Sequence, residues 1–166
     1  MIRTLGGMIG CEARARALVE RLEASLEEVR SRAAALTRRP RVYFEEWDEP
    51  QISGIRWVSE LVAIAGGEDC FPELAQEPLG RNRIIADPLE VVRRKPDVIL
   101  GSWCGKKFNA ASVAARPGWA NVPAVRNGFL REIKSSVILQ PGPAALTDGV
   151  RAIHDVIAEW NRPGRS

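Results

Sequence analysis

The stretch RVYFEEWDEPQISG, Arg41–Gly54, is the feature that most constrains the fold. An apolar segment, Val42–Phe44, has the character of a short strand and runs into an acidic, aromatic loop, Glu45–Glu49. A helical segment follows at once, and strand and helix signals then alternate along the chain. Such alternation is typical of an α/β fold, a mostly parallel sheet flanked by helices. Ligands in such folds bind beyond the carboxyl ends of the strands, so we predict a Rossmann-like lobe with its binding edge at this loop.

A long amphipathic helix is predicted before this lobe. Residues Glu12–Leu36 contain no Gly or Pro, and apolar side chains recur there at three- and four-residue steps, namely Leu18, Leu22, Leu26, Val29, Ala33 and Leu36. Pro40 cannot continue a helix and marks its end. We therefore predict two parts, an N-terminal segment with a spine helix over residues 1–37 and an α/β lobe over residues 38–166.

The other elements of the lobe are predicted from the spacing of apolar residues and from the Gly, Pro and capping residues that begin or end each segment. Helices are expected at Gly54–Ala65, Pro88–Arg94, Asn109–Ala115 and Ala145–Trp160, and further strands at Ile84–Ala86 and Asp97–Gly101. Asn127-Gly128 lies between two apolar runs, Ala124–Arg126 and Phe129–Ile133, and is a strong β-hairpin signal. The loops after Phe44 and Leu100 are expected at the same edge of the sheet.

Composition excludes several classes of protein. The 24 basic and 21 acidic residues are interspersed, and this balance predicts no nucleic-acid binding. No segment reaches the ~18 apolar residues of a membrane span. Met1–Cys11 superficially resembles a lipoprotein signal, but its apolar part is too short and too rich in Gly, so no signal peptide is predicted in this chain.

Metal and cofactor sites are also not predicted. The three cysteines, Cys11, Cys70 and Cys104, fit no zinc motif, and the single histidine, His154, is expected to pack in the last helix. The loop from Gly101 to Lys107 is one residue short of a phosphate-binding loop. Cys104 lies near Lys106, whose charge favours a thiolate, so a cysteine-dependent hydrolase stays open as an alternative to a binding protein.

Two loops offer candidate ligand contacts. In the acidic loop, Trp47 and Pro50 place rigid apolar surface between carboxylates, so the loop either faces a ligand or is simply solvated. In the loop after the strand Asp97–Gly101, Trp103 and Phe108 offer flat apolar surface and Lys106 and Lys107 offer donors. Here too, packing of the Trp beside solvated lysines is the competing interpretation.

These segments resemble the cobalamin-type periplasmic binding proteins, the helical-backbone class of substrate-binding components of ABC importers. The resemblance covers residues 2–160. It is carried by RVYFEEWDEPQISG, by the turn Gly66-Gly67-Glu68-Asp69, by Lys95–Leu100, by Arg116–Trp119 and by Val122–Gly128.

The resemblance implies a receptor of two α/β lobes joined by one long helix, with the ligand between the lobes. Glu12–Leu36 corresponds to the joining helix and Arg41–Trp160 to the C-terminal lobe, so the chain is expected to lack the N-terminal lobe, as a fragment or through a misplaced gene start. The complete protein is expected to be periplasmic or at the cell surface, to lack catalytic activity, and to deliver its ligand to the transmembrane subunits of an ABC permease.

The resemblance also implies a ligand and its site. The expected ligand is a corrinoid such as cobalamin, with a ferric siderophore or haem as the alternative. The resemblance places its contacts at Trp47, Asp48, Pro50, Gln51 and Arg83. The loop after the strand Asp97–Gly101 adds Trp103 and Lys106 to the expected contacts. The glutamate with which the family docks on permease arginines falls at Leu89, one place before Glu90, so Glu90 is the predicted docking residue.

The N-terminal segment carries apolar side chains, Ile2, Leu5 and Met8, that the missing lobe would cover. Exposed apolar patches usually find partners, so we expect the isolated chain to form a two-fold homodimer through this segment and the spine helix, and to bind a corrinoid weakly or not at all.

Overall fold

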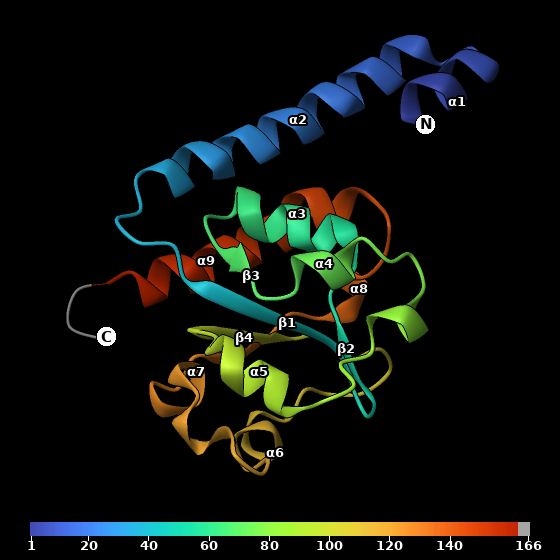
Figure 1. Cartoon of the computed structure of the whole chain (residues 1–166). Helices are drawn as coiled ribbons and strands as arrows, with labels where there is room; N and C mark the ends of the chain where they lie inside the picture. Colours follow the sequence, from blue (N-terminus) through green and yellow to red (C-terminus); the bar gives the residue numbers. More distant parts are fainter. Residues whose placement is uncertain (163–166) are drawn as a thin grey trace.

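The computed structural model describes residues 1–162 and consists of a sheet covered by helices, with a long helix lying across one helical layer (Figure 1). The strands are β1 (Arg41–Asp48), β2 (Gln51–Ser53), β3 (Glu68–Asp69), β4 (Val98–Gly101) and β5 (Leu130–Glu132). The α-helices are α1 (Ile2–Met8), α2 (Glu12–Ala34), α3 (Arg56–Ile64), α4 (Pro72–Ala75), α5 (Leu89–Arg94), α6 (Ala110–Ala114), α7 (Pro123–Arg126), α8 (Ser135–Ile138) and α9 (Val150–Trp160). Two 3₁₀ turns, η1 (Gly80–Arg83) and η2 (Trp119–Asn121), and a π-helical turn, η3 (Ala145–Gly149), complete the elements.

The sheet has the strand order β2-β1-β4-β5, and β3 also pairs with β1. Strands β3, β4 and β5 run parallel to their neighbours, and only β2 is antiparallel, because it returns from β1 through a tight hairpin. Val42 lies opposite Val98, and Phe44 lies opposite Leu100. The predicted α/β class is therefore confirmed. The parallel register also places the carboxyl ends of β1, β4 and β5 at one edge.

The core lies on both faces of this sheet, because successive side chains of a strand point to opposite faces. Phe44 and Leu100 pack on one face with Val62 of α3 and Ile157 of α9. On the other face, Tyr43 and Ile99 pack with apolar residues of the loops and short helices, including Phe71, Val91, Trp103 and Trp119. These two apolar clusters, one on each face of the sheet, fix the strands whose carboxyl ends carry the loops of the site.

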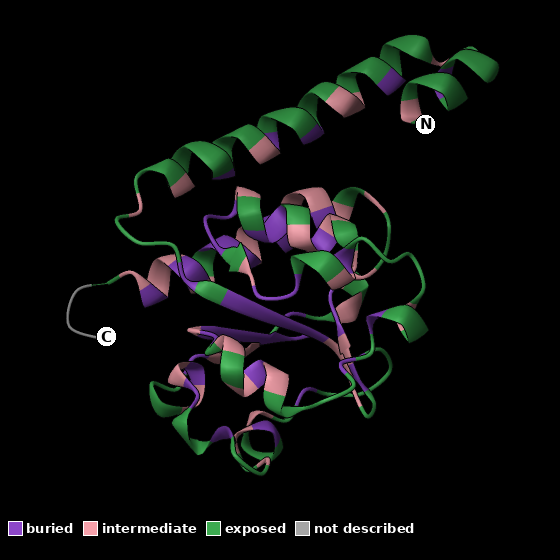
Figure 2. Cartoon of the chain, viewed as in Figure 1, coloured by how far each residue is buried: buried purple, intermediate pink, exposed green. Residues whose placement is uncertain are grey.

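The spine helix is present as α2. Val29 is fully buried, and Leu26 and Leu36 pack on the core cluster that contains α3 and α9. Past the end of α2, Leu36 reaches Gly66, where a Cβ atom would lie 2.8 Å from its Cδ1 atom and where φ is +100°. The N-terminal half of α2 extends beyond the lobe and is largely exposed, with α1 folded back on it (Figures 1 and 2).

The prediction of a β-hairpin at Asn127-Gly128 is wrong. Pro123 opens the short helix α7, Gly128 adopts a φ of +69°, and the chain then enters β5, which is parallel to β4. An Asn-Gly pair favours positive φ at a helix end as well as in a hairpin, because both need a left-handed residue. Phe129 is buried, and its carbonyl oxygen accepts a hydrogen bond from the backbone N–H of Ile99 at 2.9 Å where the chain pairs with β4.

Two further predictions need correction. The segment 84–86 forms no strand and makes only one isolated bridge, between Ile84 and Ile52. The first strand does not stop at Phe44 but runs to Asp48 and turns back as β2, so the acidic loop is a β-hairpin. Trp47 and Gln51 therefore sit on strands of the hairpin and not on a flexible connector.

Candidate functional site

The first part of the site is a buried ionic centre at the end of β1. Glu45 is fully buried, and its carboxylate accepts hydrogen bonds from Arg116 at 2.6 and 3.0 Å, from the Tyr43 hydroxyl at 2.9 Å and from Trp103 Nε1 at 3.0 Å. Burial, and next the Glu45 charge, raise the pKa of Tyr43 well above its ordinary value. Glu45 is thus neither solvated nor ligand-facing, and it fixes Trp103 against β1.

A second buried pair holds the other side of the hairpin. Arg83 donates to the carbonyl oxygens of Ser53, Glu77 and Pro78 and, at 2.7 Å, to the carboxylate of Glu46. Desolvation raises the pKa of Glu46, although the Arg83 charge opposes this shift. The Arg83 side chain is only 3% exposed. The structure gives Arg83 an internal role, and its contact with a ligand stays a prediction.

Between these centres, the β1 hairpin and the loop after β4 are joined by one lysine. Lys106 Nζ lies 2.6 Å from Asp48 Oδ1 and 2.8 Å from Asp48 Oδ2. The same ammonium lies 4.8 Å from the ring centre of Trp47 and 5.0 Å from that of Trp103. A cation at this distance is attracted to the faces of both rings. Four predicted ligand residues therefore form one cluster, and the two loops lie at one edge, as predicted.

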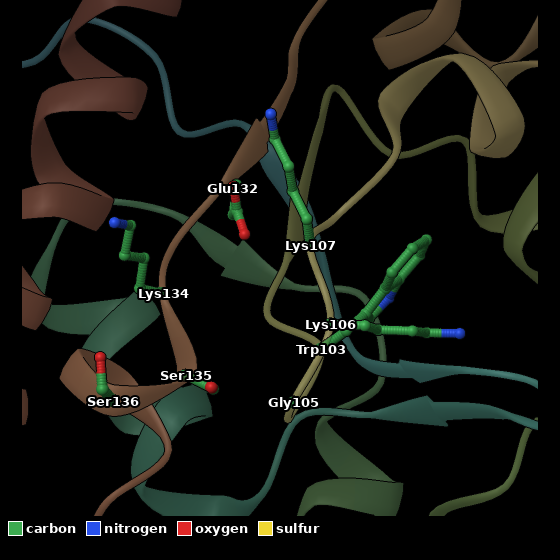
Figure 3. A pocket seen from close by; sticks show the side chains of 8 residues that line it. All are labelled: Trp103, Gly105, Lys106, Lys107, Glu132, Lys134, Ser135 and Ser136. Carbon is green, nitrogen blue, oxygen red and sulfur yellow. The ribbon is translucent and has the colours of Figure 1, made fainter.

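A cavity of about 550 Å³, the lysine pocket, lies where the loops after β4 and β5 meet (Figure 3). Its walls are Trp103, Gly105, Lys106, Lys107, Glu132, Lys134, Ser135 and Ser136. The amines of Lys107 and Lys134 make no hydrogen bond or ion pair with the part of the chain that the structure describes. Glu132 accepts a hydrogen bond from the backbone N–H of Phe108 at 3.3 Å. The pocket thus presents two free cations.

Lys134 was missed by the sequence analysis, and Lys107 was named as a possible donor but not placed among the expected ligand contacts. The signal that could have found Lys134 is its position just beyond β5, a parallel strand whose carboxyl end faces the same edge. That signal was hidden because the segment before it was interpreted as one arm of a hairpin. Lys107 adjoins a predicted residue, but sequence alone does not tell which of two neighbouring lysines faces a cavity.

A second cavity, the hairpin groove, has a volume of about 720 Å³ and lies on the other side of the Lys106–Asp48 pair. Asp48, Pro50 and Gln51 form one wall, and apolar side chains including Ile84 and Leu89 line it as well. The predicted ligand residues are therefore divided. Trp103 and Lys106 line the lysine pocket, Asp48, Pro50 and Gln51 line the groove, and Trp47 and Arg83 line neither.

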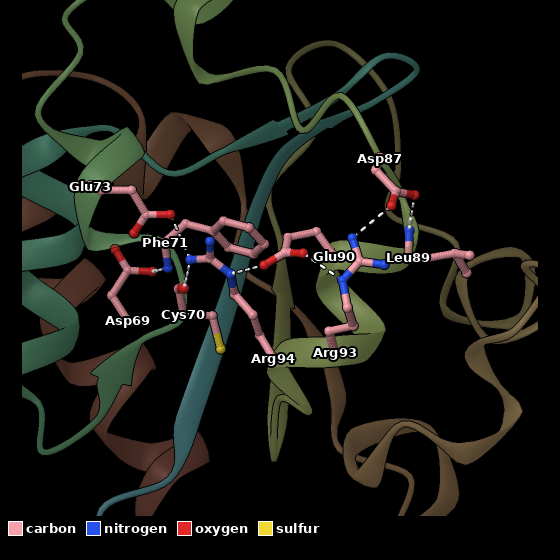
Figure 4. A network of polar contacts seen from close by, with 9 residues as sticks. All are labelled: Asp69, Cys70, Phe71, Glu73, Asp87, Leu89, Glu90, Arg93 and Arg94. Carbon is pink, nitrogen blue, oxygen red and sulfur yellow. Dashed lines mark hydrogen bonds and ion pairs between the residues drawn. The ribbon is translucent and has the colours of Figure 1, made fainter.

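The predicted docking residue lies in a local ionic network (Figure 4). Glu90 accepts hydrogen bonds from Arg93 at 2.7 Å and from Arg94 at 2.9 Å. These bonds, that of Arg94 first, hold the pKa of Glu90 below its ordinary value. Its neighbour Leu89 is 46% exposed. Docking of Glu90 on a permease stays a prediction. To dock, Glu90 would have to exchange its bonds with Arg93 and Arg94 for bonds with basic residues of the permease.

The cysteines lie in different environments. Cys70 is buried, and desolvation raises the pKa of its thiol to about 12. Cys104 is exposed, whereas His154 is buried, with Nδ1 at 3.0 Å from the carbonyl oxygen of Ala65. A histidine enclosed in this way does not reach an exposed thiol as a base.

Neither a metal centre nor a membrane span is found in the described residues, 1–162. No group of three or more His, Cys, Asp or Glu side chains is placed to hold a metal ion within that range. No helix of that range combines the length and the apolar character that crossing a membrane requires.

Solved structures share this fold. A possible iron-binding periplasmic solute-binding protein from Staphylococcus epidermidis superposes with a TM-score of 0.78 at 15% identity, over 94% of this chain and 59% of that one. A periplasmic haem-binding protein from Roseiflexus gives 0.71 at 26% identity, over 94% and 61%. An ABC-type Fe³⁺-hydroxamate transport protein from Saccharomonospora viridis gives 0.71 at 20% identity, over 93% and 53%. The chain thus spans little more than half the length of these proteins.

Sequence comparison agrees with the fold. No curated protein matches the chain significantly. Residues 1–137, however, match the family model described as Periplasmic binding protein, which covers most of the chain. The chain therefore belongs to the periplasmic binding protein family.

Proposed function

We propose that this chain is part of the solute-binding component of an ABC importer and that its lobe binds an anionic metal chelate, of the ferric-siderophore type, at the lysine pocket. The observation that carries the proposal is the pair of free amines, Lys107 and Lys134, at the edge where three parallel strands end. Two cations without internal partners favour a ligand with negative oxygen groups. Solved neighbours described as a possible iron-binding protein and as an Fe³⁺-hydroxamate transport system support a ferric chelate as the ligand, and the two free amines favour an anionic chelate over a neutral trihydroxamate.

Haem is a weaker candidate for this lobe. Protein-bound haem iron takes an axial ligand from His, Cys, Met or Tyr. The only tyrosine, Tyr43, and the only histidine, His154, are buried, and the two methionines, Met1 and Met8, lie at or next to α1. Cys104 is exposed but is not among the residues that line the lysine pocket. A siderophore already fills the coordination sphere of iron, so it needs charge complementarity from the lobe and no protein ligand.

A corrinoid remains the second candidate ligand, with Trp47, Gln51, Trp103 and Lys106 as its expected contacts. The observation in its favour is the half-exposed ring of Trp47, next to a groove with an apolar wall. A corrin rim is an apolar ring edged by amides, which suits aromatic surface with a few polar groups. A ligand of low net charge, however, offers no anionic group to pair with the free amines of Lys107 and Lys134.

The proposed partner is the transmembrane permease of the same importer, as the family implies. The complete protein would then act in the periplasm or at the cell surface. Its role is capture and delivery, so no covalent step is assigned to any residue. Glu90 on α5 is the proposed docking carboxylate of this lobe.

Calorimetry of the purified protein with a trianionic ferric tricatecholate, haem and cyanocobalamin tests the proposal. The double variant Lys107→Ala/Lys134→Ala should lose roughly fivefold in affinity for the tricatecholate, because part-exposed ion pairs contribute ~0.2–1 kcal/mol each. The loss should shrink at high salt. Arg126→Ala, which removes an exposed cation of α7 away from both cavities, is the charge-matched control. Unchanged tricatecholate affinity in the double variant, or binding of cyanocobalamin alone, would reject the anionic chelate.

A further inference from the structure

The lysine pocket contains a third lysine whose charge does not face the cavity. Lys106 contributes to the wall, yet its side chain extends away from Lys107 and Lys134, toward the strands of the hairpin (Figure 3). There its ammonium contacts both carboxylate oxygens of Asp48, at 2.6 and 2.8 Å. The charge of Lys106 is therefore neutralised by Asp48.

The Lys106–Asp48 pair also forms a boundary between two cavities. Lys106 lines the lysine pocket, whereas Asp48 lines the hairpin groove. The pair joins residues that are 58 positions apart in the chain, so it links the loop after β4 to the β1 hairpin. A ligand anion in the lysine pocket and the Asp48 carboxylate in the groove would thus approach the same ammonium from opposite sides.

The pair is weak enough to exchange. The Lys106 side chain is 44% exposed and that of Asp48 is 20% exposed, so water screens their attraction. The amine sits on a flexible four-carbon stem with three rotatable donors. It also lies over two aromatic rings, Trp47 and Trp103, which stabilise a cation without fixing the direction of its hydrogen bonds. Lys106 can therefore turn without leaving the two rings.

We propose that Lys106 is a specificity-determining residue for the negative charge of the ligand, and that Asp48 competes with the ligand for it. Asp48 holds the ammonium in this structure. When an anionic chelate occupies the lysine pocket, Lys106 transfers its hydrogen bond and ion pair from Asp48 to the chelate and becomes the third cation of the site. This inference rests on the proposed function for the pocket, but it adds a competitor and a defined movement of one side chain.

The direct test follows the side-chain ammonium signal of Lys106 by ¹⁵N NMR, assigned by its absence in Lys106→Met. Gallium(III) tricatecholate, a trianionic and diamagnetic analogue of the ferric chelate, is the probe, and a neutral gallium(III) trihydroxamate is the reference. The Lys106 signal should shift with occupancy by the tricatecholate and stay in place with the trihydroxamate. A Lys106 signal that does not move at saturating tricatecholate would overturn the inference.

Affinities of matched variants provide the second measurement. Asp48→Asn should raise the affinity for the tricatecholate about three- to fivefold, the range of a part-exposed ion pair, and leave that for the trihydroxamate unchanged. Lys106→Met should lower tricatecholate affinity, and Lys106→Arg, which keeps the charge, should restore it. Thermal unfolding verifies that each variant is folded. Weaker or equal tricatecholate binding by folded Asp48→Asn would contradict the competition.

The experiments distinguish a failure of the proposed function, binding of an anionic chelate, from a failure of the competition between Asp48 and the ligand. If the wild-type protein binds the tricatecholate through Lys107 and Lys134 while the Lys106 signal stays fixed, the proposed function stands and the competition is wrong. If the wild-type protein binds no anionic chelate, the anionic ligand and the competition are both wrong.

Discussion

Glu45 and Arg116 lie 71 positions apart in the chain and form a two-point ion pair inside the lobe, with N–O distances of 2.6 and 3.0 Å. The Glu45 side chain is fully buried and that of Arg116 is 18% exposed. Breaking a buried pair leaves one charge without compensation, so we expect Glu45→Gln to lower the free energy of unfolding by about 3 kcal/mol. Chemical denaturation followed by circular dichroism measures this change.

The matched control for that substitution is Glu60→Gln. Glu60 pairs with Arg56 on the surface of α3 at 2.9 Å, and the two side chains are 60% and 67% exposed. Helical surface pairs of this kind contribute ~0.5 kcal/mol or less. Equal losses in the two variants would mean that Glu45 does not organise the interior.

Gly101, the last residue of β4, should tolerate no side chain. A Cβ atom there would lie 1.9 Å from the Phe108 ring, so Gly101→Ala must displace the ring and with it the loop that carries Trp103. Overpacking of this kind costs ~1–3 kcal/mol. Gly7→Ala in α1 meets no atom within 4 Å and should be neutral or stabilising. Thermal unfolding compares the two, and an unchanged melting temperature for Gly101→Ala would show that Phe108 is free to move.

The arginine network of α5 should make part of the stability depend on pH. Hydrogen bonds from Arg94 and Arg93 lower the pKa of Glu90 in the folded state from 4.5. A lowered carboxyl pKa contributes stability above the unfolded pKa, and this contribution is lost as the pH falls through the folded pKa. Wild type should therefore be more stable than Glu90→Gln at neutral pH, and the difference should disappear once the pH falls below the lowered pKa of Glu90. Unfolding curves across this range measure it, and a constant difference would exclude the linkage.

The three thiols should react in a fixed order. Cys104 is exposed, Cys11 is half-buried, and Cys70 is buried with a pKa raised to about 12. Because the thiolate is the reactive form, an aromatic disulfide reagent should modify Cys104 first and Cys70 only on unfolding. Cys104→Ser should remove the fast phase. A Cys104 rate far above that of a free cysteine would instead favour the hydrolase alternative.

The N-terminal segment should drive self-association of this chain. Met1, Leu5, Met8 and Ile9 are 91%, 51%, 78% and 72% exposed. We expect a two-fold dimer through α1 and α2, with a sedimentation mass near twice 18.3 kDa. Leu5→Glu combined with Met8→Glu should shift the equilibrium toward monomer. A wild-type monomer at micromolar concentration would contradict the prediction.

Much of the fold could be predicted from sequence because its signals are local. The stripe of α2 and the apolar run of β4 repeat with the period of their elements, and both were identified. The Asn127-Gly128 signal failed because the left-handed residue it requires also ends a helix, and only pairing with β4 decides between the two. The β1 hairpin was missed because its return strand, β2, has only three residues.

The candidate site was predicted only in part, because charge pairing is not local. The sequence shows four carboxylates in a row of five residues, but not that Glu45 pairs with Arg116 and Glu46 with Arg83. It shows Lys106 and Lys107 side by side, but not that one meets Asp48 and the other faces a cavity. These partners lie 37 to 71 positions away, so only the folded sheet brings them together.

The close approach of Leu36 to Gly66 gives the end of α2 a mechanical role. A helix of 23 residues is about 34 Å long, so a tilt of one degree at its base moves its far end by about 0.6 Å. Any side chain at position 66 would push Leu36 outward and would also disfavour the φ of +100°. The direction of α2, and with it the position of α1 at its far end, therefore depends on the absence of a single methyl group about six helical turns away.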